Sequence, residues 1–360
     1  MPKIRPIAIH LPQFHPFPEN DEWWGKGFTE WTNVTKAKPL FEGHYQPHLP
    51  ADLGFYDLRL EEARLAQEAL AKEYGIYGFC YYHYWFNGKR LMNEPVDRKL
   101  KNPKEDLPFM LCWANENWTK AWDGKDKEVL IKQDYNIVDD EKHIRFLLEN
   151  VFNDSRYIRI DGKIFFVIYR PIKFPNLKET IEMWRRVAKE YNEDLYLAYM
   201  KHPSFNGHND VELFDIAIDF QPDFQNSPKP TVPTLKERVI RKLFGKRSFT
   251  FDNRLVSYKD FSDSAFQNQV FNEKTYPGIT PMWDNVARRK TNAFTMGDST
   301  PDLYGKWLEK IIKKYKGVNS NNKYLFINAW NEWAEGNHLE PCQKWGTQYL
   351  EVTKEKFDKQ

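Results

Sequence analysis

Short apolar runs recur along the chain and alternate with segments that have a helical pattern. The runs are rich in branched and aromatic residues, which is typical of strands buried on both faces of a sheet. They predict strands at residues 6–12, 78–86, 108–116, 163–170, 195–201, 214–220, 278–285 and 324–329. The segments between them predict helices at residues 59–74, 140–152, 176–191 and 301–315.

Alternating strands and helices indicate a parallel sheet with crossover connections. Eight strands in this order fit an α/β protein with a single (β/α)8 TIM barrel, and we expect residues 1–360 to form one such catalytic domain. A doubly wound sheet is the alternative. The sequence has neither the GxGxxG nor the GxxxxGK[ST] fingerprint that such sheets often carry, so we favour the barrel.

Residues 225–276 do not follow the alternating pattern of strands and helices, which predicts an insertion between the sixth and seventh strands. Between Lys229 and Arg247 there are seven lysines or arginines and one glutamate. A short amphipathic basic helix is expected there. It is either a solvated helix on a loop or a contact for an anionic lipid surface, an anionic glycan or a protein partner. Its apolar positions are Leu235, Val239, Ile240 and Leu243.

Composition narrows the function classes. The 360 residues carry a formal charge of only +2, so we expect no nucleic-acid partner. Three widely spaced cysteines indicate neither a disulfide framework nor a zinc site. No apolar run reaches membrane-spanning length and the first residues lack signal-peptide features, so we expect a cytoplasmic location, although a trimmed sequence would look the same. The 13 tryptophans and 19 tyrosines suit aromatic sugar grooves, and a tryptophan-rich core is the plainer interpretation.

The predicted strands end in aromatic and hydrogen-bonding side chains. Active sites of such barrels lie at the carboxyl ends of the strands, so we expect these side chains to converge on one polar, aromatic-lined pocket. The residues predicted to bind substrate there are His10, Gln13, Tyr82, His83, Trp113, Asn115, Glu116, Trp118, Tyr169, Trp283, Asp284, Trp330, Asn331 and Trp333.

The last predicted strand leads into tryptophans and carboxyl groups. An indole ring stacks on the apolar face of a pyranose, and glycoside chemistry needs two carboxyl groups with different tasks. Glu332 and Glu335 have the composition for such a pair, because an apolar setting and a neighbouring carboxylate push carboxyl pKa values apart. Glu116 and Asp284 are a third and a fourth carboxyl group. The alternative is that Glu332 and Glu335 are surface residues just past a strand.

Other chemistries fit less well. HEXXH and GxSxG are absent, and the histidine pairs are weak, so we expect no metal site and no cofactor. Cys80 and Cys112 lie inside predicted strands and read as small core residues. No two aspartates are spaced as the Asp-x-Asp motif of many nucleotide-sugar transferases requires, although metal-independent transferases need none.

Four segments carry a resemblance to a known family: IAIHLPQFHPFPENDEWWGKGFTEWTNV, GFCYYHYWF, PFMLCWANENWT and INAWNEWAEGNHLEP. Together they resemble the WbsX-type glycan-biosynthesis proteins, which are also described as a glycoside hydrolase family 99-like domain. The resemblance covers nearly the whole chain, and the basic insertion matches least. The better-understood relatives are family 99 endo-α-mannosidases and endo-mannanases, which are (β/α)8 barrels that act with retention and need no metal.

The resemblance implies a catalytic Glu-Trp-x-Glu segment, here Glu332 to Glu335, with Ala334 where the family pattern has histidine. It implies that Glu332 is the base that deprotonates the sugar 2-hydroxyl, which attacks the anomeric carbon and gives a 1,2-anhydrosugar. Glu335 would be the acid on the leaving oxygen and then the base for water. Glu116 matches a further acidic residue more loosely. Arg288 resembles a substrate-contacting arginine, with a surface salt bridge as the alternative.

Two reactions and one non-catalytic role stay open at this point. The first reaction is that of a retaining glycosidase or transglycosylase on a mannose-like glycan of the bacterial surface, such as an O-antigen or capsule. The second is that of a cytoplasmic glycosyltransferase in O-antigen or capsule assembly, with the basic insertion facing a membrane or a lipid-linked acceptor. The third interpretation is a sugar-binding barrel without activity, which has no physical need of an acid/base pair.

Overall fold

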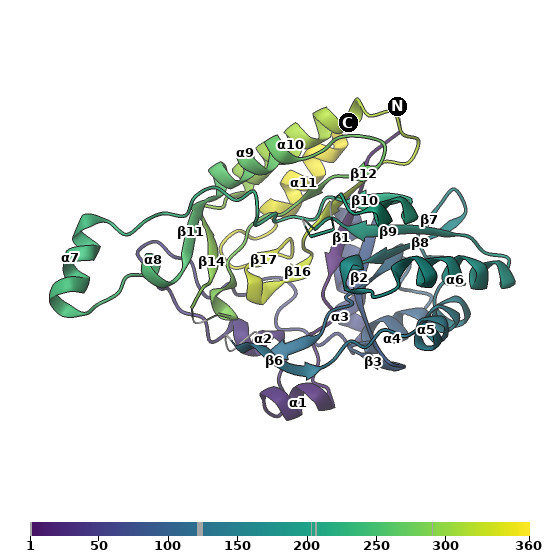
Figure 1. The fold of residues 1–360 in the computed structure, drawn as a ribbon. Helices are drawn as coiled ribbons and strands as arrows, with labels where there is room; N and C mark the ends of the chain where they lie inside the picture. Colours follow the sequence, from purple (N-terminus) through teal and green to yellow (C-terminus); the bar gives the residue numbers. More distant parts are fainter. Residues whose placement is uncertain (1, 121–124, 203, 206, 290) are drawn as a thin grey trace.

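Parallel strands follow one another around a ring in the order of the sequence (Figure 1). The computed structural model describes residues 2–120, 125–202, 204–205, 207–289 and 291–360. Each strand of the first part of the ring pairs in parallel with the next one. These strands are β1 (Arg5–His10), β2 (Gly78–Phe86), β4 (Phe109–Trp113), β8 (Lys163–Ile168), β9 (Leu195–Met200) and β10 (Ile216–Ile218).

One segment closes the ring. β12 (Thr275–Tyr276) pairs with β10, and β13 (Gly278–Ile279), one proline further on, pairs with β15 (Tyr324–Ile327). β15 in turn pairs with β1. A Cβ atom on Gly278 would lie 2.0 Å from the carbonyl oxygen of Asp219, so glycine is needed where this segment passes the end of β10. The predicted TIM barrel is therefore confirmed.

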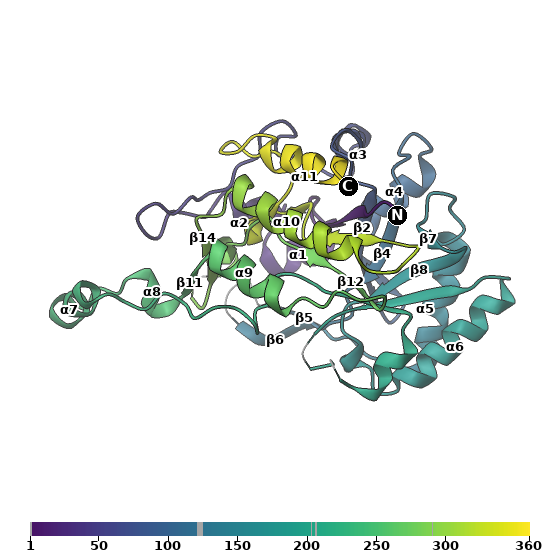
Figure 2. The same cartoon turned by 90° about the horizontal axis from the view of Figure 1, so that it is seen from above.

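Helices cover the outside of the ring (Figure 2). The four predicted helices are confirmed with shifts of a few residues at their ends, and short antiparallel strands β3 (Lys89–Leu91) and β7 (Arg159–Ile160) extend the sheet. Between β9 and β10 the described residues hold only the 3-10 turn η3 (Asn209–Leu213). The outer helices are α3 (Glu61–Glu73), α4 (Glu94–Lys101), α5 (Ile137–Asn150), α6 (Leu177–Glu190), α9 (Tyr258–Asn268), α10 (Pro301–Lys316) and α11 (Gln348–Asp358).

The loops at the carboxyl ends of the strands carry further small elements. The loop after β1 contains two short helices, and other loops contain three two-stranded sheets. Along the described chain, no helix combines the length and the apolar character needed to cross a membrane. The elements are α1 (Pro18–Trp24), α2 (Glu30–Val34), β5 (Trp118–Lys120) with β6 (Lys125–Ile131), β11 (Arg254–Ser257) with β14 (Phe294–Gly297), β16 (Asn331–Glu332) with β17 (Asn337–His338), and the 3-10 turns η2 (Pro171–Lys173), η4 (Asn285–Ala287) and η5 (Trp333–Glu335).

The predicted insertion extends too far. Helices α7 (Leu235–Phe244) and α8 (Phe249–Asp252) do project from the barrel, at the left of Figure 1. However, α9 packs on the barrel through buried Tyr258, Phe261 and Ala265, and β12 is part of the ring. A two-residue strand is too short to produce an alternating pattern, which is why the end of residues 225–276 was assigned wrongly.

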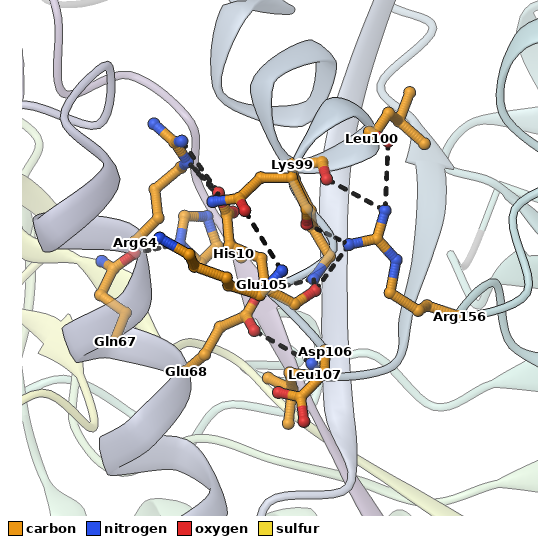
Figure 3. Close-up of polar contacts among 12 residues, drawn as sticks. His10, Arg64, Gln67, Glu68, Lys99, Leu100, Glu105, Asp106, Leu107 and Arg156 are labelled. Atoms are coloured by element: carbon orange, nitrogen blue, oxygen red, sulfur yellow. Dashed lines mark hydrogen bonds and ion pairs between the residues drawn. The ribbon is translucent and has the colours of Figure 1, made fainter.

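Buried ion pairs hold α3 and α4 against the barrel (Figure 3). Arg64 pairs with Glu105 at 2.8 Å, and Lys99 pairs with Glu68 at 2.5 Å. The four side chains are at most 7% exposed. Arg156 donates to the carbonyl oxygens of Asn102, Lys99, Leu100 and Glu105, so the end of α4 and the loop after it are tied to the segment between α5 and β7.

We expect Glu105→Ala to lower the free energy of unfolding by about 3–5 kcal/mol, because it leaves the Arg64 guanidinium buried without its counter-charge. Urea denaturation followed by circular dichroism measures this loss. Glu182→Ala removes an exposed partner of Lys178 and is the control, with an expected loss below about 1 kcal/mol. Equal losses in the two variants would show that the buried pair does not stabilise this face of the barrel.

Candidate active site

A cavity of about 810 Å³ lies at the carboxyl ends of the barrel strands. This volume is in the range of small-molecule and oligosaccharide sites. The predicted site residues in its wall are Gln13, Tyr82, Glu116, Trp118, Tyr169, Trp283, Arg288, Glu332 and Glu335. The structure thus brings together residues from the first, second, third, fourth, seventh and last strand ends, as a barrel site requires.

One arginine contacts three carboxyl groups in this wall. Arg288 Nη2 lies 2.7 Å from Glu30 Oε1 and 2.8 Å from Glu332 Oε2. Its Nη1 lies 2.8 Å from Glu335 Oε1. The Glu30 side chain is fully buried, that of Glu332 is 8% exposed and that of Glu335 is 22% exposed. Glu335 is therefore the carboxyl group of this cluster that reaches furthest toward solvent.

The backbone around the pair is tightly turned. Glu332 ends β16 and Glu335 belongs to η5, so the two carboxyl groups sit on successive short elements. Gly336 follows with φ +54°, where a Cβ atom would lie 2.9 Å from the carbonyl oxygen of Asp284. The Asp284 N–H in turn donates to the Glu335 carbonyl oxygen at 2.7 Å. This packing leaves the Glu332 and Glu335 side chains little freedom to separate.

Glu30 is a site residue that the sequence did not single out. Its Oε1 accepts from Arg288 and also from the N–H of Ala334, at 2.9 Å, so it braces the arginine and the η5 turn together. Glu30 opens helix α2 in the loop after β1, about three hundred positions from Ala334. The sequence contains Glu30 in the GFTEW part of the opening motif. That motif does not indicate that Glu30 contacts residues after the last strand.

The cluster retains a proton at neutral pH. Burial raises the pKa of Glu332 to about 8, with Arg288 opposing the rise and Glu335 and Glu30 adding to it. Burial also raises the pKa of Glu335, again against the effect of Arg288. One guanidinium cannot neutralise three carboxylates, so the cluster has a lower free energy when it shares one proton than when all three groups are ionised. A carboxyl group protonated near neutral pH is what general acid catalysis requires.

Strand alternation directs some predicted binding residues away from the cavity. Successive side chains of a strand point to opposite faces, so Tyr82 faces the cavity and His83 faces the helices. His83 Nε2 lies 2.9 Å from His143 Nε2 of α5, and His10 Nε2 lies 3.2 Å from Gln67 Oε1 of α3. Burial lowers the pKa of His10 and of His83 to about 3. Both are neutral packing residues, and the structure does not bring them into the cavity wall.

Trp113, Asn115 and Asp284 also lie outside the wall that the described residues form. Trp113 is buried against Trp184 of α6. Asn115 joins the ends of β4 and β8, since its Oδ1 accepts from Arg170 N at 2.7 Å and its Nδ2 donates to Arg170 O at 2.9 Å. Asp284 Oδ2 lies 2.6 Å from His44 Nε2 and accepts from Gln46 at 2.7 Å. The polar atoms of Asn115 and Asp284 are thus bound within the protein, and Trp113 is a packing residue.

The two tryptophans beside the glutamates are buried and do not line the cavity. Trp330 is fully buried and its ring contacts Phe79. Trp333 is stacked on His338, with ring centroids 3.8 Å apart, and its Nε1 donates to Glu340 at 2.7 Å. Neither ring is open to a sugar. Asn331 is likewise internal, because its Oδ1 accepts from Leu11 N and its Nδ2 donates to Leu11 O.

Glu340 is a second functional position that the sequence did not single out. One carboxyl oxygen accepts from Gln67 at 2.7 Å, and the other accepts from Tyr56 at 2.8 Å and from Trp333. Burial raises the pKa of Glu340 to about 7. Glu340 therefore fixes Trp333, which lies between Glu332 and Glu335 in the chain. Its signal was present in the HLEP end of the closing motif.

Further polar side chains complete the cavity wall. Arg170 Nε lies 3.3 Å from Glu116 Oε1, and Lys201 Nζ lies 3.5 Å from Asp219 Oδ1. Trp118 lies parallel to Tyr84, with ring centroids 5.5 Å apart. Among the described residues, no group of three or more His, Cys, Asp or Glu side chains is placed to hold a metal ion. Aromatic rings interleaved with paired charges suit a hydroxyl-rich ligand.

A (β/α)8 barrel with a carboxyl cluster in a cavity at the strand ends is an arrangement that glycoside chemistry can use. The chain belongs to the family described as Glycosyltransferase WbsX, which it matches over residues 6–353. It is 37% identical over 351 residues to the uncharacterized protein WxcX of Xanthomonas campestris pv. campestris, across 97% of this chain and 49% of that protein. The chain thus spans about half the length of this curated relative.

Solved structures confirm the barrel. A glycoside hydrolase-like protein superposes with a TM-score of 0.61 at 15% identity, covering 99% of this chain and 94% of the other. The glycoside hydrolase family 99 endo-α-mannosidase from Bacteroides thetaiotaomicron superposes with a TM-score of 0.56 at 13% identity, covering 100% and 98%. At these identities the likeness shows the fold alone. The expected membership of the WbsX family is confirmed, and the fold is shared with a family 99 barrel.

We expect the protonated carboxyl group of the cluster to be visible by infrared difference spectroscopy. The wild-type spectrum at pH 6 should contain a carboxylic acid component that is missing from Glu332→Gln and is lost as the pH rises through about 8, whereas the component of Glu340 is present in both proteins. Glu30→Gln removes a neighbouring negative charge, so Glu332 ionises more easily and the titration moves to lower pH. A Glu332 band already lost at pH 6 in the wild type would contradict the shared proton.

Proposed function

We propose that the protein is a retaining glycosidase or transglycosylase that acts on a mannose-like glycan of the bacterial surface, with Glu332 and Glu335 as its acid/base pair. The observation that carries the proposal is the arrangement of these two carboxyl groups on the two terminal nitrogens of Arg288, in the wall of a large cavity. Their raised pKa values keep a proton in the pair at neutral pH.

In the first step Glu332 acts as the base. The sugar 2-hydroxyl donates a hydrogen bond to Glu332, which favours the ionised form and leaves the shared proton on Glu335. Arg288, 2.8 Å away, stabilises the Glu332 carboxylate. The 2-oxygen then attacks the anomeric carbon as its proton passes to Glu332. The glycosidic bond breaks, Glu335 protonates the leaving oxygen, and a 1,2-anhydrosugar remains.

In the second step the roles reverse. The Glu335 carboxylate takes a proton from an incoming hydroxyl, whose oxygen attacks the anomeric carbon, and Glu332 returns its proton to the 2-oxygen. The configuration is retained because the anomeric carbon is inverted twice. Water as the incoming group gives hydrolysis, and a sugar hydroxyl gives transglycosylation. The greater exposure of Glu335 supports this assignment, since it must reach both the leaving and the incoming oxygen.

A glycosyltransferase of surface-glycan assembly is the second candidate function. The description of the family as glycosyltransferases favours it. Cationic side chains in the cavity wall, which include Arg170, Lys201 and Arg254, would suit the phosphates of a nucleotide-sugar donor. In that reaction Glu332 or Glu335 would serve only as the base for the acceptor hydroxyl. A cytoplasmic site of action stays a prediction, which cell fractionation of the bacterium tests.

We expect Glu332→Gln and Glu335→Gln each to lower turnover at least about 100-fold, within the usual effect of removing a general acid or base. Binding of the glycan should be largely kept, because both side chains remain polar and of equal size. The purified protein is incubated with α-mannan fragments and bacterial O-glycans, and separately with nucleotide sugars and acceptors, and products are read by mass spectrometry. Glu182→Gln, on the exposed face of α6, is the matched control.

Product from glycan alone, lost in Glu335→Gln, supports the glycosidase or transglycosylase. If product forms only when a nucleotide sugar is present, the protein is a glycosyltransferase and the two-step scheme is wrong. Wild-type turnover in both glutamine variants removes Glu332 and Glu335 from the chemistry. Glycan binding without any turnover in the wild type identifies a sugar-binding barrel, for which the acid/base pair has no task.

A further inference from the structure

A basic arm stands away from the barrel and takes no part in the cavity chemistry. The arm is residues 229–247, and none of them is buried. Figures 1 and 2 both show helix α7 at its far end, separated from the rest of the molecule. Its helix has no buried residue, so its apolar side is not used inside this chain.

The apolar side chains of the arm are unusually open. Leu235, Val239 and Leu243 are four positions apart and share one face of α7, with exposed fractions of 78%, 46% and 68%. Phe244 is 70% exposed and Val232 is 67% exposed. Leaving so many large apolar groups in water is unfavourable for a helix that is merely solvated, and contiguous exposed apolar groups mark an interaction surface.

Basic side chains surround this apolar face. The arm has seven lysines or arginines and one glutamate. Three of the arginines are engaged locally: Arg247 pairs with Asp252, Arg238 Nε donates to Pro233 O, and Arg241 lies over the ring of Phe251. Within the described part of the chain the remaining cations have no ion-pair partner, which leaves them available to an anionic surface. They are Lys229, Lys236, Lys242 and Lys246.

The helix carries its own end signals, so it does not need the barrel in order to form. Thr234 and Glu237 make a reciprocal capping box, in which Glu237 N donates to Thr234 Oγ1 at 3.2 Å and Thr234 N donates to Glu237 Oε2 at 2.7 Å. Gly245 ends the helix in the left-handed conformation, at φ +66°. A helix stabilised in this way is presented ready to bind.

The arm begins at the candidate active site. The chain that leads into it contributes to the cavity wall through Pro222, Asp223, Phe224, Gln225 and Asn226. Thr231 N donates to Leu255 O at 2.7 Å, and Ser264 Oγ donates to Asn226 O at 2.7 Å, so the base of the arm is attached to β11 and α9. Anything that binds to α7 is therefore connected to the cavity through a short segment that is anchored to the barrel.

We propose that the arm docks the protein on an anionic lipid surface. The apolar face of α7 enters the headgroup region and the lysines meet acidic headgroups, as in peripheral amphipathic helices. A convex, isolated helix with cations around its apolar stripe complements a planar anionic layer, whereas a protein partner would have to supply a concave acidic groove. Docking does not depend on the reaction catalysed. Its consequence, that the cavity works on glycans carried by lipids, rests on the proposed function.

The test is co-sedimentation of the full 360-residue protein with vesicles of phosphatidylcholine, with and without phosphatidylglycerol. We expect binding only when phosphatidylglycerol is present, and weaker binding as salt is added. Lys236→Glu/Lys242→Glu should lower the partition coefficient at least about tenfold, since each cation near an anionic surface contributes about fivefold. Leu235→Ser/Leu243→Ser should lower it as well. The matched control is Lys313→Glu/Lys314→Glu on exposed positions of α10, which should bind like the wild type.

Equal losses in the arm variants and the α10 control would overturn the proposal, because binding would then follow net charge alone. So would absence of binding to phosphatidylglycerol vesicles at low salt, even if the arm captured a protein. The arm positions are exposed, so the variants should keep the wild-type circular dichroism spectrum. Activity on a soluble glycan should be the same in the arm variants and the wild type. If the wild-type protein binds vesicles but has no such activity, membrane docking stands and the proposed function fails.

Discussion

A single buried guanidinium holds the candidate active site together. Arg288 follows the seventh strand position of the ring, Glu30 lies in the loop after the first, and Glu332 and Glu335 follow the last. Three carboxyl groups at this depth repel one another and lose hydration, and removing Arg288, which contacts all three, would leave several kcal/mol of uncompensated charge. Its partners come from the two ends of the chain, and Arg288 itself follows the segment that closes the ring, so Arg288 links closure of the barrel to assembly of the site. The proton that the cluster retains has the same origin, since one cation balances only part of the charge.

Beneath that cluster, buried hydrogen bonds connect the site to the outer helices. Trp333 donates to Glu340, Glu340 accepts from Gln67 of α3, and Gln67 contacts His10. Close by, the same helix α3 carries the buried ion pairs of Figure 3. The sequence suggests that these aromatic and polar residues bind a sugar. In the structure they instead hold the Glu332–Glu335 segment in place. Such support matters because acid/base catalysis requires the two carboxyl groups to stay within hydrogen-bond reach of the reacting oxygens.

The family is described as glycosyltransferases, and the proposed two-step scheme accommodates transfer to a sugar as well as hydrolysis. A pair of carboxyl groups that activates an incoming hydroxyl works with water or with a sugar, and the choice depends on which one the cavity retains. The cavity is large and polar, and the basic arm begins at its wall. Under the proposed scheme, transfer from one sugar to another and glycoside hydrolysis use the same two residues and differ in the acceptor beside Glu335.

The sequence by itself determined the order of strands and helices and the site of the carboxyl pair after the last strand, because hydrophobic periodicity and chain order are local properties. It also determined the helix within the basic segment, whose caps and spacing are local. Only the tertiary structure decided which side of each strand faced the cavity, so that Tyr82 belongs to the site and His83 does not. It also recruited Glu30, and it ended the insertion at β12, where two residues pair in the ring. These outcomes depend on strand register, barrel closure and contacts across three hundred positions, which no local pattern encodes.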